Sequence, residues 1–249
     1  MHFIVHITDN ISIFVRKKTI MIKAVISGDI VASTSLTDAG RELIEKALEE
    51  LIDELSKSFN TYSRIIKGDY LECVVPNPED ALLVALAIKS FVKSILIEGT
   101  SLYKINKRVK LFKTYGIRLA IGYGTLNRYD PDKGIIDGEA IYLSGRTINE
   151  FSTYKKERIV IKNTMYFVSN DSNLNETFEP IIALLDVLIN KATSKQCKVL
   201  YLKLMNNNED TISAILGIKQ SVVNQHSTSV GWNAIERTVK YFNEVIKKQ

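Results

Sequence analysis

Residues 27–35 read SGDIVASTS and follow the apolar run MIKAVI at residues 21–26. The run predicts a buried strand that ends at Gly28 and Asp29, with small and hydroxyl residues after it. An acidic side chain in that place has two ordinary uses. Asp29 either caps the turn or helix that follows, or it binds a cation. The choice depends on what the rest of the chain brings to the end of this strand.

The composition is that of an ordinary globular protein. The chain has 249 residues, of which 45% are hydrophobic and 24% are charged. Its net charge of +5 is compatible with a polyanionic partner such as nucleic acid or nucleotide phosphate. No apolar run reaches the roughly 18 residues of a membrane span. Three histidines are too few for a histidine-rich metal site, and Cys73 and Cys197 are expected to be buried, reduced thiols.

The first 20 residues differ in pattern from the rest of the chain. They contain an apolar stretch whose charges come after it, and no small-residue cleavage site comes next, which argues against a secretory signal. We therefore expect residues 1–20 to be an extension before a natural start at Met21. The default expectation is a cytoplasmic protein.

Residues 21–168 alternate between strand and helix patterns and are expected to form one α+β domain. Apolar residues at helical spacing predict a helix over residues 38–59, capped by Thr37 or Asp38. The order of all the patterns, β-α-β-β-α-β-(β)-α-β, predicts a ferredoxin-like sheet with helices on one face. The other predicted elements are strands over residues 62–66, 70–75, 115–127 and 157–163, and helices over residues 79–96 and 139–154.

The composition changes near residue 169. Residues 169–180, SNDSNLNETFEP, are rich in serine and asparagine and end in proline, so they predict a linker. Residues 181–249 show only helical patterns and predict a second, all-α domain. Nine basic and five acidic residues give residues 180–249 a net charge of +4, most of the excess of the whole chain.

Two aspartates lie at the ends of neighbouring strands of the predicted sheet. Asp29 ends the first strand, and Asp69 lies in the turn between the strands at residues 62–66 and 70–75. In a βαββαβ fold these strands are neighbours, so the two carboxylates are expected to converge and to repel unless a cation lies between them. Oxygen ligands suit Mg²⁺ or Mn²⁺, which in turn suit phosphate-bearing ligands.

Four motifs follow one another along the chain over about residues 22–161: GDIVAST, IIKGD, RLAIGYG and DGEAIYLSGR. With them the chain resembles the catalytic domain of class III nucleotide (adenylate/guanylate) cyclases. The resemblance implies that Asp29, Asp69 and the carbonyl of Ile30 bind metal, and that Arg146 is a catalytic arginine that stabilises triphosphate charge. The set expected to bind nucleotide phosphate is Gly28, Lys67, Gly138 and Arg146.

The sequence departs from the cyclase pattern where the base and sugar are recognised. The two purine-selecting positions are Ile65 and Ile135, and the ribose-orienting asparagine is Tyr142. The residues that the cyclase pattern assigns to metal and phosphate are present, whereas those that position the base and the ribose are replaced. Chemistry that depends on positioning suffers from such losses, so the pattern favours nucleotide binding over purine cyclisation.

The tail contains a short helix pattern, EDTISAIL at residues 209–216, a glycine turn, and a second helix pattern from residue 220. This arrangement resembles the helix-turn-helix of bacterial regulators, and a bundle used for dimerisation is the alternative. In the first interpretation Ile212, Ile215, Leu216, Ile218, Val222 and Val223 form the core between the helices. The residues expected to face DNA are Lys219, Gln220, Ser221, Asn224, Gln225 and Ser227.

As a whole, the cyclase-like part followed by a helix-turn-helix resembles the SatD-like bacterial proteins. The first hypothesis is a nucleotide- or metal-sensing, DNA-binding transcriptional regulator with a degenerate cyclase domain. The alternative is an active, divergent nucleotidyl cyclase that uses two divalent ions, and the third is an inert fold whose tail binds protein. A homodimer is expected, because cyclase sites are shared between chains and DNA readers pair half-sites.

Overall fold

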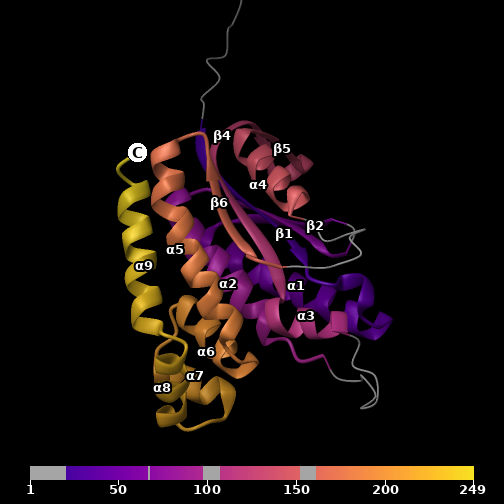
Figure 1. Cartoon of the computed structure of the whole chain (residues 1–249), viewed down its shortest axis with the longest axis vertical. Coiled ribbons are helices and arrows are strands. Elements are labelled where there is room, and N and C mark those ends of the chain that lie inside the picture. The colour runs from indigo at the N-terminus through magenta and orange to yellow at the C-terminus, as the bar shows by residue number, and fades with distance from the viewer. Residues whose placement is uncertain (1–20, 67, 98–106, 152–160) are drawn as a thin grey trace, which may run out of the picture.

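The computed structural model describes residues 21–66, 68–97, 107–151 and 161–249 (Figure 1). Its strands form one six-stranded sheet. Five of them follow the order β2-β3-β1-β4-β5, and the sixth, β6, also pairs with β4. All pairs are antiparallel except β4 with β6. The bounds are β1 Met21–Ile30, β2 Tyr62–Ile66, β3 Tyr70–Val75, β4 Ile117–Asp130, β5 Ile135–Gly138 and β6 Met165–Ser169.

The first four strands and two helices follow the predicted ferredoxin-like order. Helix α1 (Asp38–Phe59) connects β1 to β2, and helix α2 (Ala81–Ser94) follows β3. Thr37 caps α1 as expected, because its side chain accepts a hydrogen bond from the amide of Gly40. Asn60 ends the helix in the left-handed conformation at φ 53°. The apolar stripe of α1, which is Ile44, Leu48, Leu51 and Leu55, is buried.

Helices cover both faces of the sheet, whereas the sequence predicted helices on one face. Ala24 and Ile26 of β1 share a core with α1 and α2, while Val25 packs on the opposite face with Ala140 of α4 (Glu139–Glu150). The close approach of α4 depends on Gly122 of β4, where an added Cβ would lie 2.1 Å from the carbonyl oxygen of Ala140. The glycines of β4 are therefore the feature that admits a helix to this face.

The chain between residues 97 and 172 contains two further differences from the predictions. The basic stretch before β4, for which no element was predicted, forms α3 (Lys107–Tyr115). The strand expected at residues 157–163 begins outside the described residues, and the structure instead places β6 at Met165–Ser169. Residues 1–20, with the expected extension, also lie outside the described residues.

The segment predicted as a linker is largely helical. Asp171 caps α5 (Ser172–Lys191) by accepting from the amides of Asn173 and Leu174. Leu174 and Phe178, one helical turn apart, are both buried. Burial of this pair outweighs the serine and asparagine composition that suggested a loop. The division of the chain into two domains stays a prediction.

The tail consists of α6 (Ser194–Leu204), α7 (Glu209–Leu216), α8 (Gln220–Ser229) and α9 (Trp232–Ile246). Figure 1 shows α5 and α9 side by side along the sheet, with α7 and α8 at the far end of the tail, and α6 packs against α2. One continuous buried core runs from the sheet into these helices and includes both free cysteines, Cys73 and Cys197. None of the described helices is long and apolar enough to span a bilayer.

Buried lysines of α2 tie α5 to the sheet. Lys89 is fully buried, and its ammonium donates to the carbonyls of Tyr115 and Ile117 at 2.7 Å each and to Thr164 Oγ1 at 2.6 Å. Asp186 of α5 lies 3.6 Å from the same ammonium. One turn further, Lys93 donates to the last carbonyls of α5, at Ile189 and Asn190. Charged groups buried in this way need several partners, so α5 is held in one place.

Candidate functional site

Asp29 binds a cation, and that cation is an arginine of the same chain. In the antiparallel pairing of β1 with β4, Asp29 lies directly opposite Arg118. Arg118 Nε donates to Asp29 Oδ1 at 2.9 Å, and a second guanidinium nitrogen donates to Oδ2. The side chain of Asp29 is only 20% exposed and that of Arg118 only 5%. Both carboxylate oxygens of Asp29 are therefore engaged in a two-point ion pair that is largely buried.

Asp69 lies beside this pair, at the same end of β1. In the pairing of β1 with β3, Asp29 lies opposite Tyr70, the residue after Asp69. The backbone carbonyl of Asp69 accepts a hydrogen bond of 3.0 Å from the amide of Ile30. Its carboxylate accepts a hydrogen bond of 2.7 Å from Ser33 Oγ. The turn that carries Ser33 starts at Ala32, which has a left-handed φ of 59°. The structure thus brings Asp29, Ile30 and Asp69 together.

The electrostatics reflect two close carboxylates in a partly buried place. Burial raises the pKa of Asp29 above its ordinary value of 3.8. The Arg118 guanidinium acts in the opposite direction, and the negative charge of Asp69 adds to the increase. Arg118 is the group that compensates the charge of Asp29 at this end of the strand.

A cavity of about 370 Å³ opens next to Asp69. Ser33 and Thr34 line it with hydroxyl groups, and Arg41 of α1 contributes a positive charge. Arg41 is held by its hydrogen bond of 3.2 Å to the carbonyl of Leu36 and by an ion pair with Asp38. Hydroxyls and a guanidinium suit a phosphate group. The remaining lining residues are Ile30, Leu36, Ile44, Glu45, Gly68 and Asp69.

The residues present do not fit a two-metal centre in this arrangement. Both oxygens of Asp29 accept from Arg118, and one oxygen of Asp69 accepts from Ser33. Within the described ranges, no group of three or more histidine, cysteine, aspartate or glutamate side chains could hold a metal ion. Mg²⁺ and Mn²⁺ need several oxygen ligands, so binding them here requires the Asp29–Arg118 pair to open.

The predicted phosphate residues are not gathered at the cavity. Gly28 and Gly138 are packing positions: a Cβ at Gly28 would lie 2.6 Å from Leu119 Cδ2, and one at Gly138 would lie 2.6 Å from the carbonyl oxygen of Thr125. Gly138 also has a φ of 149°. Lys67 lies outside the described residues. Their roles toward a nucleotide remain predictions.

Arg146 is exposed on α4. The buried positions of this helix are Ala140, Ser144 and Ile148, so Arg146, two residues after Ser144, lies on the side turned from the sheet. Within one chain it does not line the cavity beside Asp69. On the same helix, the hydroxyl of Tyr142 donates to Asp137 at 2.8 Å, in the place where the cyclase pattern has its ribose-orienting asparagine.

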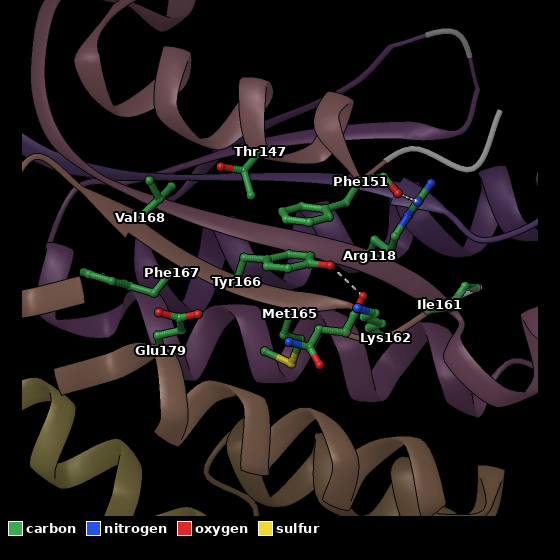
Figure 2. Close-up of a pocket in the computed structure, with 11 residues that line it drawn as sticks. Arg118, Thr147, Phe151, Ile161, Lys162, Met165, Tyr166, Phe167, Val168 and Glu179 are labelled. Atoms are coloured by element: carbon green, nitrogen blue, oxygen red, sulfur yellow. Dashed lines mark hydrogen bonds between the residues drawn. The ribbon is translucent and has the colours of Figure 1, made fainter. Parts of the chain in front are cut away.

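Arg118 also borders a second cavity of about 530 Å³, between α4 and β6. Figure 2 shows Arg118 reaching the carbonyl of Phe151, whose ring stacks on Tyr166 with ring centroids 4.5 Å apart. The guanidinium therefore bridges Asp29 on one side and the end of α4 on the other. Arg118 is therefore a structural group that connects β1 to the end of α4.

In the tail, α7 and α8 are joined by the short turn at Gly217, which takes a left-handed φ of 62°. Of the residues expected to face DNA, five are exposed: Lys219, Gln220, Ser221, Asn224 and Gln225. Ser227 is not available, because it is 3% exposed and its hydroxyl donates to the carbonyl of Asn224. Ile215, expected in the core between the helices, is 55% exposed because it lies on the outer side of α7.

Glu209, in the first turn of α7, organises this surface. Its carboxylate forms an ion pair of 2.9 Å with Lys203 and accepts hydrogen bonds from Gln220 and Asn224. Two of the residues expected to read DNA are thus directed toward an acidic side chain of the same chain.

The sequence-based reasoning missed Arg118, Arg41, Ser33 and Thr34 as members of the site. Arg118 stands in the motif RLAIGYG, but its role depends on the register that places it opposite Asp29. Ser33 and Thr34 stand in GDIVAST, where the hydroxyl pair after the aspartate was the available signal.

Comparison with known proteins gives little beyond a distant likeness. No family model and no curated protein matches the chain. Two structures of a bacterial light-regulated adenylyl cyclase are similar to part of it. One has a TM-score of 0.39 and 12% identity, over 59% of this chain and 43% of that chain. The other has a TM-score of 0.38 and 13% identity, over 60% and 43%. The chain spans less than half the length of these structures.

Proposed function

We propose that the chain is a nucleotide-sensing, DNA-binding transcriptional regulator of the SatD-like type, whose cyclase-like part binds its ligand without cyclising it. The observation that carries this proposal is the pairing of both Asp29 oxygens with Arg118. Cyclisation of the class III type, as the resemblance implies it, needs both aspartates on metal ions. A buried guanidinium on one of them supports binding in place of catalysis.

The nucleotide end of the proposal is the cavity beside Asp69. Arg41 and Thr34 are the groups we assign to a phosphate, since the hydroxyl of Ser33 already donates to Asp69. In a homodimer, the exposed Arg146 of a second copy is free to approach such a ligand from outside. The acidic Glu45 and Asp69 also line the cavity, so a ligand with a hydroxyl-rich or cationic part beside its phosphate is favoured over inorganic phosphate.

The DNA end of the proposal is the outer side of α8. Lys219, Gln220 and Ser221 begin this helix, and Asn224 and Gln225 follow one turn later, all exposed. Amide side chains at the start of a helix are suited to base edges once Gln220 and Asn224 release Glu209, and lysine is suited to phosphate. The positive charge of the tail supports the same partner.

This function is tested by fluorescence anisotropy of a labelled random DNA duplex titrated with the full chain at several salt concentrations. We expect the logarithm of the affinity to fall linearly with the logarithm of salt concentration. Lys219→Gln should reduce that slope by about one, since one phosphate contact is lost. Lys46→Gln, an equal charge change on the exposed side of α1, should leave the slope unchanged. An affinity that does not vary with salt, or no binding at low salt, contradicts the DNA part of the proposal.

A further inference from the structure

A cavity of about 420 Å³ is lined by the end of α2, by α6 and by the α7–α8 pair. Both α2 and α8 pack on α6. One wall comes from the end of α2 and the residues just after it, and the other from α7, α8 and the turn between them. The lining residues are Phe91, Ser94, Ile95 and Leu96 on the first wall, Leu216, Ile218, Val222 and His226 on the second, and Ser194, Lys195, Lys198 and Val199 on α6.

The walls of this cavity are mainly apolar. Leu96 is 66% exposed, and Ile95, Ile218 and Val222 are only partly buried. Isolated exposed apolar side chains are common, but a concave group of them with room for a small molecule is the usual form of a ligand pocket.

The polar groups of the cavity carry positive charge. Lys195 and Lys198 come from the first turns of α6, which begins with a capping box at Thr193 and Gln196. The ammonium of Lys198 lies 5.1 Å from the centre of the Phe91 ring, so it is held at the apolar wall. Among the described residues that line the cavity, none is acidic. The amino end of α6 adds a partial positive charge in the same place.

We propose that this cavity binds an amphipathic organic anion: an apolar chain or ring bearing a carboxylate or a similar group. The apolar body lies between Ile95 and Leu96 on one wall and Ile218 and Val222 on the other, and the anionic head lies at Lys195 and Lys198. The site goes beyond the proposed function and is independent of the cavity beside Asp69. Its occupant contacts both the sheet-bound helix α2 and the helix α8 assigned to DNA, and so is placed to act as an effector.

The test is isothermal titration calorimetry of the full chain with octanoate and with 1-octanol, which share a chain length and differ in the charge of the head group. We expect saturable binding of octanoate at a single site and weaker binding of 1-octanol. The double variant Lys195→Gln/Lys198→Gln removes both ammonium groups, so it should weaken octanoate by at least about tenfold and leave 1-octanol unchanged. Lys46→Gln/Lys57→Gln on α1 makes the same charge change outside the cavity and should alter neither.

Val222→Trp, which fills the cavity, should weaken both compounds, with folding checked by circular dichroism. If that variant does not fold, the lysine variants still decide the test, because both lysines reach the surface of α6. Absence of saturable octanoate binding overturns the proposal, as does an equal loss of 1-octanol binding in the lysine variant. Failure of DNA binding contradicts the proposed function and leaves this site standing, since the titration contains no DNA.

Discussion

At the scale of single residues, the site depends on one cross-strand pair. A guanidinium presents two parallel donors to a carboxylate, and Arg118 uses them on Asp29. The sequence was sufficient to predict that Asp29 and Asp69 lie close together at the end of β1, and the metal ion expected between them stays a prediction. The sequence was not sufficient to predict that Arg118 pairs with Asp29, because the two residues are 89 positions apart and only the register of β1 with β4 brings them together.

Arg118→Ala should convert this place into a divalent-cation site. Removing the guanidinium frees both oxygens of Asp29 next to Asp69, and the two carboxylates then repel unless a cation binds. We expect the variant to lose roughly 3–5 kcal/mol of stability, as when one partner of a buried pair is removed. Millimolar Mn²⁺ should raise its melting temperature, with little effect on the wild type.

The matched control for this experiment is Asp29→Asn/Arg118→Ala, which lacks the second carboxylate. Its melting temperature should not respond to Mn²⁺. An equal response of wild type and Arg118→Ala would show that the arginine does not occupy the position of the ion, and would contradict this account of Asp29.

At the scale of elements, local signals predicted the helices that have clear caps. Helix α1 has the predicted bounds, and α7 runs from its cap at Asn208 to Gly217 as its sequence pattern indicates. Composition misled at α5, where Leu174 and Phe178 are buried one turn apart within a serine- and asparagine-rich segment. The pattern of apolar spacing was the better signal there than the polar residues between.

Glu209 gives α7 a pH-dependent link to its neighbours. The hydrogen bond from Lys203 holds the pKa of Glu209 below its ordinary value of 4.5. Its stabilising effect is therefore complete above about pH 4.5 and is lost as the pH falls through the lower folded-state pKa. Glu209→Gln keeps an acceptor for Gln220 and Asn224 but removes the charge, and should cost about 0.5–1 kcal/mol at pH 7.

Thermal unfolding of wild type and Glu209→Gln, followed by circular dichroism at pH 7 and at about pH 3, measures this effect. The two melting temperatures should differ at pH 7 and approach each other at low pH, where the wild-type carboxylate is protonated. A difference that persists unchanged at low pH would show that the charge of Glu209 is not what stabilises α7.

At the scale of the whole molecule, the order of elements was sufficient to predict the ferredoxin-like sheet, because strand order follows from the βαββαβ pattern. The placement of the tail was not predictable in the same way. The contacts of Lys89 with Asp186 and of Lys93 with the end of α5 join residues about 100 positions apart, and no local pattern reports them. These contacts hold α5 against the sheet, and the buried core continues from the sheet into α6, α7 and α8.

In the proposed function, the part of the chain that resembles a cyclase binds a nucleotide without cyclising it. Mass spectrometry of the full chain incubated with each of the four nucleoside triphosphates and Mn²⁺, beside Asp29→Ala, tests this most directly. We expect no cyclic nucleotide from any of the four, in either protein, because both oxygens of Asp29 are held by Arg118. A cyclic product from the wild type that disappears in Asp29→Ala would contradict it and would make Asp29 a catalytic metal ligand.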